Sequence, residues 1–372
     1  MSSFSNLDLK AKFCFVCFMS LLLIIIIEML HFFYIFIYPR DNVKGILHFN
    51  NYTHHDYMPN ALFTNYATGE DDYPPAVVSI NSMGIRGPEL KQKTSYRVIF
   101  LGDSFIQADE VQFKKTFGQK LNEHFSGRVE FISHGISSWS PIIEFSWLYH
   151  KGISLEPDEV NLFLCINDFW GDEKYGRQAV FYGDIPICYK AQKSKGSMVS
   201  YLKNNLLIIS AFKKVKKLFE FEKSDQKSFL TDVIQPYCET DKKDWPHNRR
   251  KYYNRTLLIV SQINKFLISK NIQLNVFLTP MGYAWKDEIQ GVRNLSAYKG
   301  LNNRTISQNS LERNMFEDFQ KLGVKFYRLE SVFSEVKERN QNLKLFNSSD
   351  GHWNQNGHET LAHYFRNFYK DR

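Results

Sequence analysis

Residues that interrupt or cross-link a chain are scarce in this sequence. Among 372 residues there are 11 prolines, 19 glycines and 5 cysteines, and we find no internal repeat or low-complexity tract. Hydrophobic residues make up 43% of the chain and charged residues 23%, which is typical of globular rather than disordered proteins. We therefore expect folded structure almost throughout, with one large domain and a smaller additional element.

The sequence also lacks the spacings of common nucleic-acid and metal sites. Zinc-finger spacing, the aromatic signature of RNA-binding domains and a basic-region heptad are all missing, so only the formal charge of +8 favours nucleic acid. The histidines are not paired at metal-ligand spacing, such as His-x-x-x-His beside a carboxylate. We expect no nucleic-acid partner, no metal and no cofactor.

The few cysteines say little about the cellular compartment. Cys14 and Cys17 lie in a strongly apolar stretch, and Cys165 ends another apolar run. Only Cys188 and Cys238 stand in polar surroundings that suit a disulfide. A disulfide and two separate thiols fit their spacing equally well.

One long apolar run lies near the N-terminus. Residues 13–38 are interrupted only by Ser20, Glu28 and His31, and about 20 apolar residues cross a bilayer as a helix. Aromatic residues gather at its far end, as in an interfacial belt. The run is longer than the apolar region of a signal peptide, and no small-x-small cleavage site follows it. We therefore favour an uncleaved transmembrane anchor, preceded by an N-terminal tail of residues 1–12.

The rest of the chain alternates between short apolar runs and longer segments with helical spacing. After a polar, turn-rich lead-in at residues 39–95, we expect buried strands at 97–101, 129–133, 160–165, 274–278 and 324–329. Helical spacing occurs at 113–125, 142–150, 252–270 and 310–322. This alternation predicts a parallel sheet covered by helices on both faces, with ligands bound at the carboxyl ends of the strands.

A long segment interrupts this alternation between the third and fourth expected strands. Residues 169–250 are rich in Lys, Tyr and Phe, and we predict a cap inserted in a domain that spans 96–372. Within the cap, residues 201–221 combine an apolar face with five lysines. An interfacial helix and a cap helix with a solvated basic face both fit this pattern, and we favour the cap helix.

Polar motifs stand where three successive expected strands end. Gly102-Asp103-Ser104 follows the first strand, Gly135 the second, and Asn167-Asp168 the third. Each motif alone fits ordinary turn or helix-cap chemistry. At one sheet edge, however, a serine hydroxyl could attack a carbonyl group while backbone N–H groups and a carboxamide stabilise the oxyanion.

The last loop before the C-terminal helix supplies a base for such a hydroxyl. A serine nucleophile needs a neighbouring base, and that base needs a group that holds its tautomer. Asp350 and His352 form a suitable pair. His358 and His363 lie in the following helical segment, and we interpret them as packing or surface residues.

These four segments, in this order, resemble the sequence blocks of the SGNH/GDSL hydrolase family over roughly residues 80–370. The resemblance implies an α/β, three-layer, flavodoxin-like fold with a parallel five-stranded sheet, here with a cap insertion and an N-terminal transmembrane helix. It implies Ser104 as nucleophile, His352 as its base and Asp350 as the group that orients the imidazole.

The resemblance also implies the surroundings of the nucleophile. The amides of Ser104 and Gly135 and the side chain of Asn167 would form the oxyanion hole, with Asp103 and Asp168 as supporting residues. Two positions depart from the family pattern: Cys165 replaces a common glycine, and Asp350 precedes His352 by two residues rather than three. The second departure resembles the Asp-x-His-Trp-Asn variant of polysaccharide-modifying relatives, although alginate acetyltransferases carry that motif before their serine.

The sequence thus predicts a membrane-anchored serine esterase that acts on acyl esters of an envelope glycan or lipid, with its catalytic domain in the periplasm. Charge alone does not orient the anchor, because lysine and arginine are nearly balanced on its two sides. An O-acyltransferase that modifies a cell-surface polysaccharide with a membrane acyl-donor partner would use the same residues. A non-catalytic glycan-binding protein would instead use four tryptophans as stacking surfaces, namely Trp139, Trp170, Trp285 and Trp353.

Overall fold

The structure of the protein is a computed structural model. It describes residues 9–37, 46–65, 75–190, 237–238, 240–282, 309–347 and 351–372. The chain divides into two compact units, residues 1–42 with 192–226 and residues 43–191 with 227–372. The predicted cap helix at 201–221, Trp285 and Asp350 lie outside the described residues.

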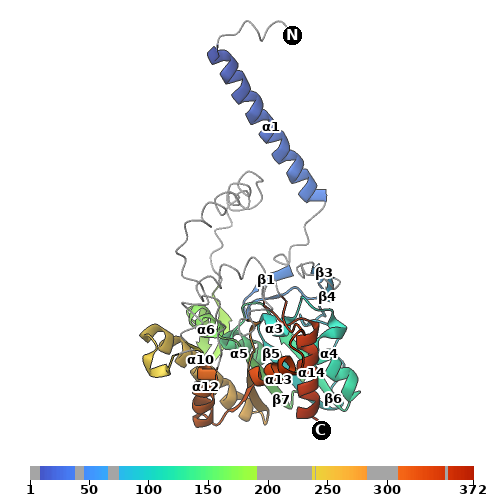
Figure 1. Ribbon diagram of the computed structural model, residues 1–372, viewed down its shortest axis with the longest axis vertical. Coiled ribbons are helices and arrows are strands. Elements are labelled where there is room, and N and C mark those ends of the chain that lie inside the picture. The colour runs from blue at the N-terminus through green and yellow to red at the C-terminus, as the bar shows by residue number, and fades with distance from the viewer. Residues whose placement is uncertain are drawn as a thin grey trace. The chain divides into compact units, whose positions relative to one another are not determined.

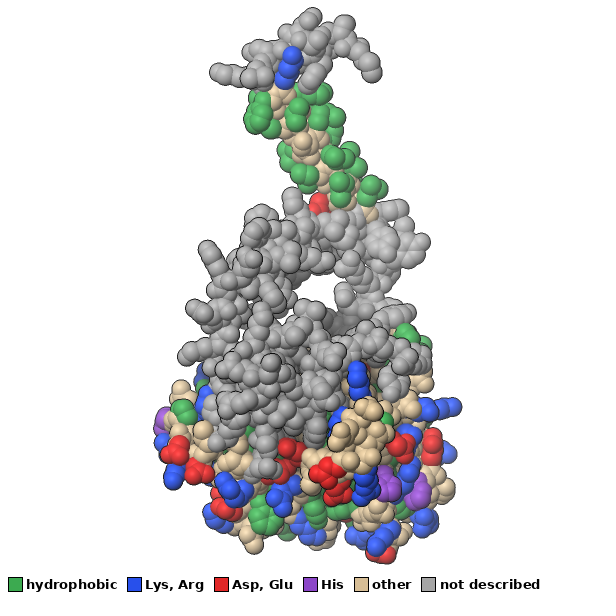
Figure 2. Space-filling view, in the orientation of Figure 1, with side chains coloured by type: hydrophobic (Ala, Val, Ile, Leu, Met, Phe, Trp, Pro, Cys, Tyr) green, Lys and Arg blue, Asp and Glu red, His purple; other side chains and the backbone are tan. Residues whose placement is uncertain are grey.

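The element described in the first unit is the helix α1 (Leu9–Ile37). Its segment Lys12–Leu30 is long and apolar enough to cross a membrane, and none of it is buried. Figure 2 shows apolar side chains along the visible face of this helix. Length and composition therefore fit the predicted anchor, and they fit a signal sequence equally well.

A parallel sheet of five strands forms the centre of the second unit (Figure 1). Its strands are β5 (Tyr96–Gly102), β6 (Val129–Gly135), β7 (Glu159–Leu164), β10 (Gln273–Leu278) and β11 (Lys325–Arg328). Their order across the sheet is β11-β10-β7-β5-β6. Read from β6, this is the 2-1-3-4-5 order of flavodoxin-like folds. The five predicted strands and the predicted fold class are confirmed.

Helices cover both faces of this sheet, as expected (Figure 1). Phe100, Phe163 and Phe277 pack on one face with α4 (Phe117–Phe125), α13 (Glu330–Arg339) and α14 (Gln355–Phe368). Leu101, Leu162 and Val276 pack on the other face with α5 (Pro141–His150), α10 (His247–Ile268) and α12 (Asn309–Lys321). Neighbouring residues of a strand point to opposite faces, so continuous apolar runs fill both layers.

The lead-in forms two hairpins that belong to the domain. Strands β1 (Leu47–Asn50) and β2 (His54–Tyr57) pair with each other, as do β3 (Leu62–Asn65) and β4 (Ala76–Ser79). Buried side chains such as Tyr57 join the core on the α5 side of the sheet. Because each strand has only four residues, their alternation was too short to predict strands from the sequence.

Both described ends of the predicted cap belong to the core. Helix α6 (Asp168–Gly176) follows β7 and packs against α5 and α10. The hairpin of β8 (Ala179–Tyr182) and β9 (Ile185–Tyr189) comes next, and α10 already begins at His247. The described 3-10 turns are η1 (Phe113–Lys115), η2 (Gly152–Leu155) and η4 (Lys242–Asp244). The remainder of the predicted cap, residues 191–236 and 239, lies outside the described residues.

The two cysteines that could pair both lie in the described part of the chain. Cys188 lies in β9 and is partly exposed, whereas Cys238 is buried. They are not joined by a disulfide. Of the two possibilities that the spacing left open, the structure has separate thiols.

Candidate active site

Ser104 begins the short helix α3 (Ser104–Gln107), directly after β5. Asp103 caps this helix, because its carboxylate accepts a hydrogen bond from the N–H of Phe105 at 3.0 Å. A Cβ atom at Gly102 would lie 2.7 Å from the side chain of Ile106, so the turn needs a glycine. The hydroxyl of Ser104 is thereby placed, partly exposed, at the carboxyl end of β5, which lies between β6 and β7 in the sheet.

His352 reaches this hydroxyl from the other end of the chain. Its Nε2 atom lies 2.8 Å from Oγ of Ser104, across a sequence separation of 248 residues. The ring of Phe105 packs on the imidazole, with ring centroids 4.8 Å apart. Nε1–H of the buried neighbour Trp353 donates to the carbonyl oxygen of Pro280 at 3.1 Å, which fixes the His352 segment. This serine–histidine hydrogen bond is the contact that an activated nucleophile requires.

The other ring nitrogen of His352 faces a carboxylate that the sequence analysis did not single out. Oε1 of Glu110 lies 3.9 Å from Nδ1 of His352. Asp350, the predicted orienting residue, lies outside the described residues. The sequence did contain a signal for Glu110, because two acidic residues follow the nucleophile motif closely at Asp109 and Glu110.

The structure places Gly135 at the end of β6, beside the nucleophile turn. The register of the sheet pairs it with Gly102. A Cβ atom at Gly135 would lie 2.5 Å from the carbonyl oxygen of Asp103 and 2.8 Å from that of Gly102. Any other residue would therefore push β6 away from the turn that carries Ser104.

Asn167 links the end of β7 to the same turn. Its Nδ2 atom donates a hydrogen bond to Oδ2 of Asp103 at 3.3 Å. The next residue, Asp168, accepts a hydrogen bond from the N–H of Cys165 at 2.7 Å and so closes the turn after β7. A carboxamide carries two N–H donors, so Asn167 keeps one for a further acceptor. The structure thus brings Ser104, Gly135, Asn167 and His352 together at one edge of the sheet.

Buried carboxyl groups surround the base of this site. Burial raises the pKa of Asp103 and, together with the neighbouring Glu144, raises the pKa of Asp168 well above its usual range. Burial likewise raises the pKa of Glu144 strongly and that of Asp172 to about 6. A raised pKa favours the neutral carboxyl, which carries no charge to repel a developing oxyanion.

The other C-terminal histidines do not compete with His352. His358 is buried, and its Nδ1 atom accepts a hydrogen bond from the N–H of Phe117 at 3.3 Å. Burial lowers the pKa of His358 to about 3, so the ring is neutral. His363 is exposed on α14. They are a packing and a surface residue, as interpreted from the sequence.

Among the predicted stacking tryptophans that the structure describes, Trp170 is exposed. Trp139 and Trp353 are each 1% exposed, whereas Trp170 is 54% exposed. Trp139 and Trp353 are therefore core residues and form no glycan-stacking surface. Trp170 lies in the first turn of α6, and its backbone N–H donates to the carbonyl oxygen of Asn167 at 3.2 Å. The ammonium group of Lys174 lies 5.2 Å from its ring centroid.

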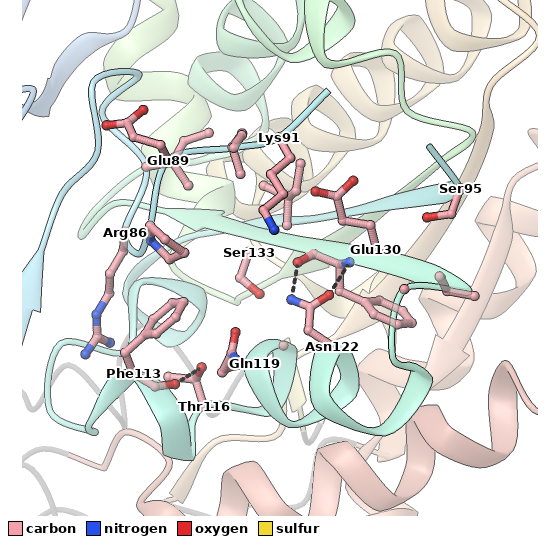
Figure 3. Close-up of a pocket in the computed structure, with 18 of the residues that line it drawn as sticks. Arg86, Glu89, Lys91, Ser95, Phe113, Thr116, Gln119, Asn122, Glu130 and Ser133 are labelled. Carbon is pink, nitrogen blue, oxygen red and sulfur yellow. Dashed lines mark hydrogen bonds between the residues drawn. The ribbon is translucent and has the colours of Figure 1, made fainter. Parts of the chain in front are cut away.

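A cavity of about 450 Å³ lies away from this cluster, beside the edge strand β6 (Figure 3). Lead-in residues such as Arg86 and Lys91 line it together with residues of α4, and Ser104 does not. The side chain of Asn122 donates to the carbonyl oxygen of Phe131 and accepts from its N–H, both at 2.8 Å. Asn122 thus occupies the polar backbone groups of the sheet edge at that point.

Comparisons with known proteins give structural matches. No family model matches the sequence, and no curated protein matches it significantly. A catalytic mutant of Axe2, an acetylxylan esterase from Geobacillus stearothermophilus, is 12% identical with a TM-score of 0.37, covering 74% of this chain and 95% of that chain. The acetyl xylan esterase AlAXEase is 15% identical with a TM-score of 0.38, covering 72% of this chain and 97% of that chain.

A third solved structure is BT4096, a gut microbial diltiazem-metabolizing enzyme. It is 13% identical to this chain with a TM-score of 0.33, and the match covers 73% of this chain and 46% of that chain. Identity and overlap of this extent define no correspondence of individual site residues. The roles of the site residues therefore rest on the geometry of this chain.

Proposed function

We propose that the protein is a serine hydrolase of acyl esters, with Ser104 as nucleophile and His352 as general base. The observation that carries this proposal is the hydrogen bond of 2.8 Å between Oγ of Ser104 and Nε2 of His352. It lies at the carboxyl ends of β5 and β7, where the strand order of the sheet reverses and where ligands bind in such folds.

In the proposed reaction, Oγ of Ser104 attacks the ester carbonyl carbon while its proton moves to Nε2 of His352. The amides of Ser104 and Gly135 and the second N–H of the Asn167 side chain donate to the oxyanion. The alcohol then leaves with the proton from Nε2, and an acyl-serine remains. His352 then takes a proton from water as the water oxygen attacks the acyl carbon, and it returns this proton to Oγ of Ser104 as the acid leaves. In this proposal Asp350 has the role that the resemblance implies, which is to orient the imidazole.

An O-acyltransferase is the second candidate function, because it shares the first half of this reaction. A sugar hydroxyl would then replace water as the acceptor of the acyl group. The observation that favours it is the apolar helix α1, which could anchor the protein beside a membrane partner that delivers the acyl donor. In either case we propose a single-pass anchor, a periplasmic catalytic domain, and a glycan or lipid ester as substrate.

Fluorophosphonate labelling tests the proposed nucleophile directly. The full-length protein in detergent micelles is incubated with the reagent, and wild type is compared with Ser104→Ala by intact mass. We expect one adduct on wild type and none on the variant. Labelling that persists in Ser104→Ala would rule out this serine, and well-folded wild type without an adduct would favour a non-catalytic glycan-binding protein.

A further inference from the structure

The loop after the nucleophile helix places a carboxylate beside the second nitrogen of His352. Oε1 of Glu110 lies 3.9 Å from Nδ1, while Nε2 of the same ring bonds to Ser104. The side chains of His352 and Glu110 are only 22% and 15% exposed, so water screens the pair weakly. An opposite charge at this distance favours the protonated imidazole, which is the form that must be stabilised during acyl transfer.

Arg86 of the lead-in fixes the loop that carries Glu110. Its guanidinium donates to the carbonyl oxygen of Gln107 at 3.3 Å, to that of Val111 at 2.6 Å, and at short distance to that of Ala108. Five N–H groups in one rigid plane allow a single side chain to hold three carbonyl groups. Residues 107–111 are therefore closed into a turn around this guanidinium.

The residues on either side of Ala108 are held as well. Ala108 ends α3 in the left-handed region, with φ of 51°, and this conformation reverses the chain. The hydroxyl of Tyr57 donates to Asp109 at short distance, and the side chain of Gln107 donates to the same hydroxyl at 2.5 Å. Asp109 is consequently fixed in the core, and the side chain of the next residue, Glu110, lies beside the imidazole of His352.

Other charged groups near His352 come from several elements. Asp103 and Asp109 both interact with its charge, and Arg86 interacts with Asp109 and Glu110. Burial raises the pKa of Asp103, and it raises the pKa of Asp109 to about 7, so Asp109 is partly protonated near neutral pH. Asp103 and Asp109 are 2% and 4% exposed, less than the side chain of Glu110.

We propose that Glu110 is a positioning residue for His352. In this role Glu110 helps the proposed Asp350 to orient the imidazole and to stabilise its protonated form. This inference rests on the proposed function of Ser104 and His352. It assigns a catalytic contribution to the lead-in, because Tyr57 and Arg86 fix the loop from outside the segments that resemble known hydrolase blocks.

The test measures His352 itself, so that it does not depend on turnover. The full-length protein in micelles carries ¹⁵N-labelled histidine, and the ring signals of His352 are assigned by comparison with His352→Gln. Wild type, Glu110→Gln, Glu110→Asp and the control Glu123→Gln are titrated by NMR. Glu123 is a suitable control because it is exposed on α4, where its side chain accepts a hydrogen bond from Gln119.

We expect Glu110→Gln to lower the titration midpoint of His352 by about one pH unit, and Glu110→Asp to restore part of it. In Glu110→Gln, kcat/KM for p-nitrophenyl acetate should fall about tenfold relative to wild type. The same substitution should also lower kcat/KM about tenfold when it is added to Asp350→Asn. A midpoint unchanged in a Glu110→Gln protein that melts at the wild-type temperature would overturn the proposal. Failure of the proposed function would show instead as inactive wild type without a fluorophosphonate adduct.

Discussion

Oγ of Ser104 and Nε2 of His352 lie 2.8 Å apart although 248 residues separate them in the chain. Ser104 follows β5, the first strand of the sheet along the chain, and His352 lies in the last loop before the C-terminal helix α14. The hydrogen bond therefore forms only when the first and last parts of the domain are both folded. The proposed esterase activity should for this reason be a sensitive measure of the complete domain.

The pH dependence of activity should follow the titration of His352. Only the neutral imidazole accepts the serine proton, so kcat/KM should rise with pH through a midpoint of about 6 to 7 and then level off. His352→Ala should lower kcat by at least about 1,000-fold, whereas Asp350→Asn should leave a larger residual rate. Rates with p-nitrophenyl acetate from pH 5 to 9 measure this, and a flat profile would contradict a histidine base.

Gly135→Ala should damage the site through the backbone. The new Cβ atom would lie 2.5 Å from the carbonyl oxygen of Asp103, so β6 or the nucleophile turn must shift. We expect stability to fall by about 1 to 3 kcal/mol and kcat to fall about 10- to 100-fold, because small displacements cost much in catalysis. Urea unfolding and ester hydrolysis measure the two effects.

Ser137→Ala is the matched control for that substitution. Ser137 lies two residues beyond Gly135, and its side chain is exposed, so its loss should leave the stability and kcat near wild type. If Gly135→Ala behaved like Ser137→Ala, the close approach of β6 to the nucleophile turn would have no part in catalysis.

The sequence predicted the central sheet because parallel strands are buried on both faces. The strand β7 is buried at every position from Glu159 to Leu164, so it stands out as a continuous run. Ser104, Gly135 and Asn167 could be placed for a related reason, since residues directly after such runs must meet at one sheet edge. His352 follows no such run, and the resemblance to hydrolase blocks implied its role as the base.

The surroundings of the site could not be predicted in the same way. The contacts of Arg86 go to backbone carbonyl groups, and no residue type in the loop identifies a partner for it. Glu110 contacts His352 only because Ala108 adopts a left-handed conformation, which its residue type disfavours. Such contacts depend on tertiary geometry, and periodicity carries no information about them.

Asp172→Asn should make stability less dependent on pH. Burial raises the pKa of Asp172 from 3.8 to about 6, so the folded state binds its proton more tightly than the unfolded state. Between about pH 4 and 6 the free energy of unfolding therefore falls with rising pH, by about 3 kcal/mol from this group. An amide cannot ionise, and its N–H₂ group can donate to the hydroxyl of Thr256, which now donates to Asp172 at 2.5 Å.

The measurement is urea unfolding of wild type and Asp172→Asn at pH 4, 5, 6 and 7. The stability of the variant should decline less across this range, although Asp109, whose pKa is raised to about 7, still contributes a decline. Asp184→Asn, an exposed carboxyl in the turn between β8 and β9, should follow wild type. Parallel curves for wild type and Asp172→Asn would show that Asp172 is not the group responsible.

Trp170→Ala should separate glycan substrates from small esters. Trp170 is 54% exposed and lies one helical turn from Asn167, so a sugar attached to the reacting ester could stack on its ring. Losing a contact worth about 1 kcal/mol should raise KM about fivefold for an acetylated oligosaccharide, while p-nitrophenyl acetate, which carries no sugar, should be unaffected. Tyr182→Ala is the control, because Tyr182 is 73% exposed but lies in the β8–β9 hairpin. Equal changes for both substrates would indicate that Trp170 supports the fold of α6, and no change for either would argue against a glycan bound at this helix.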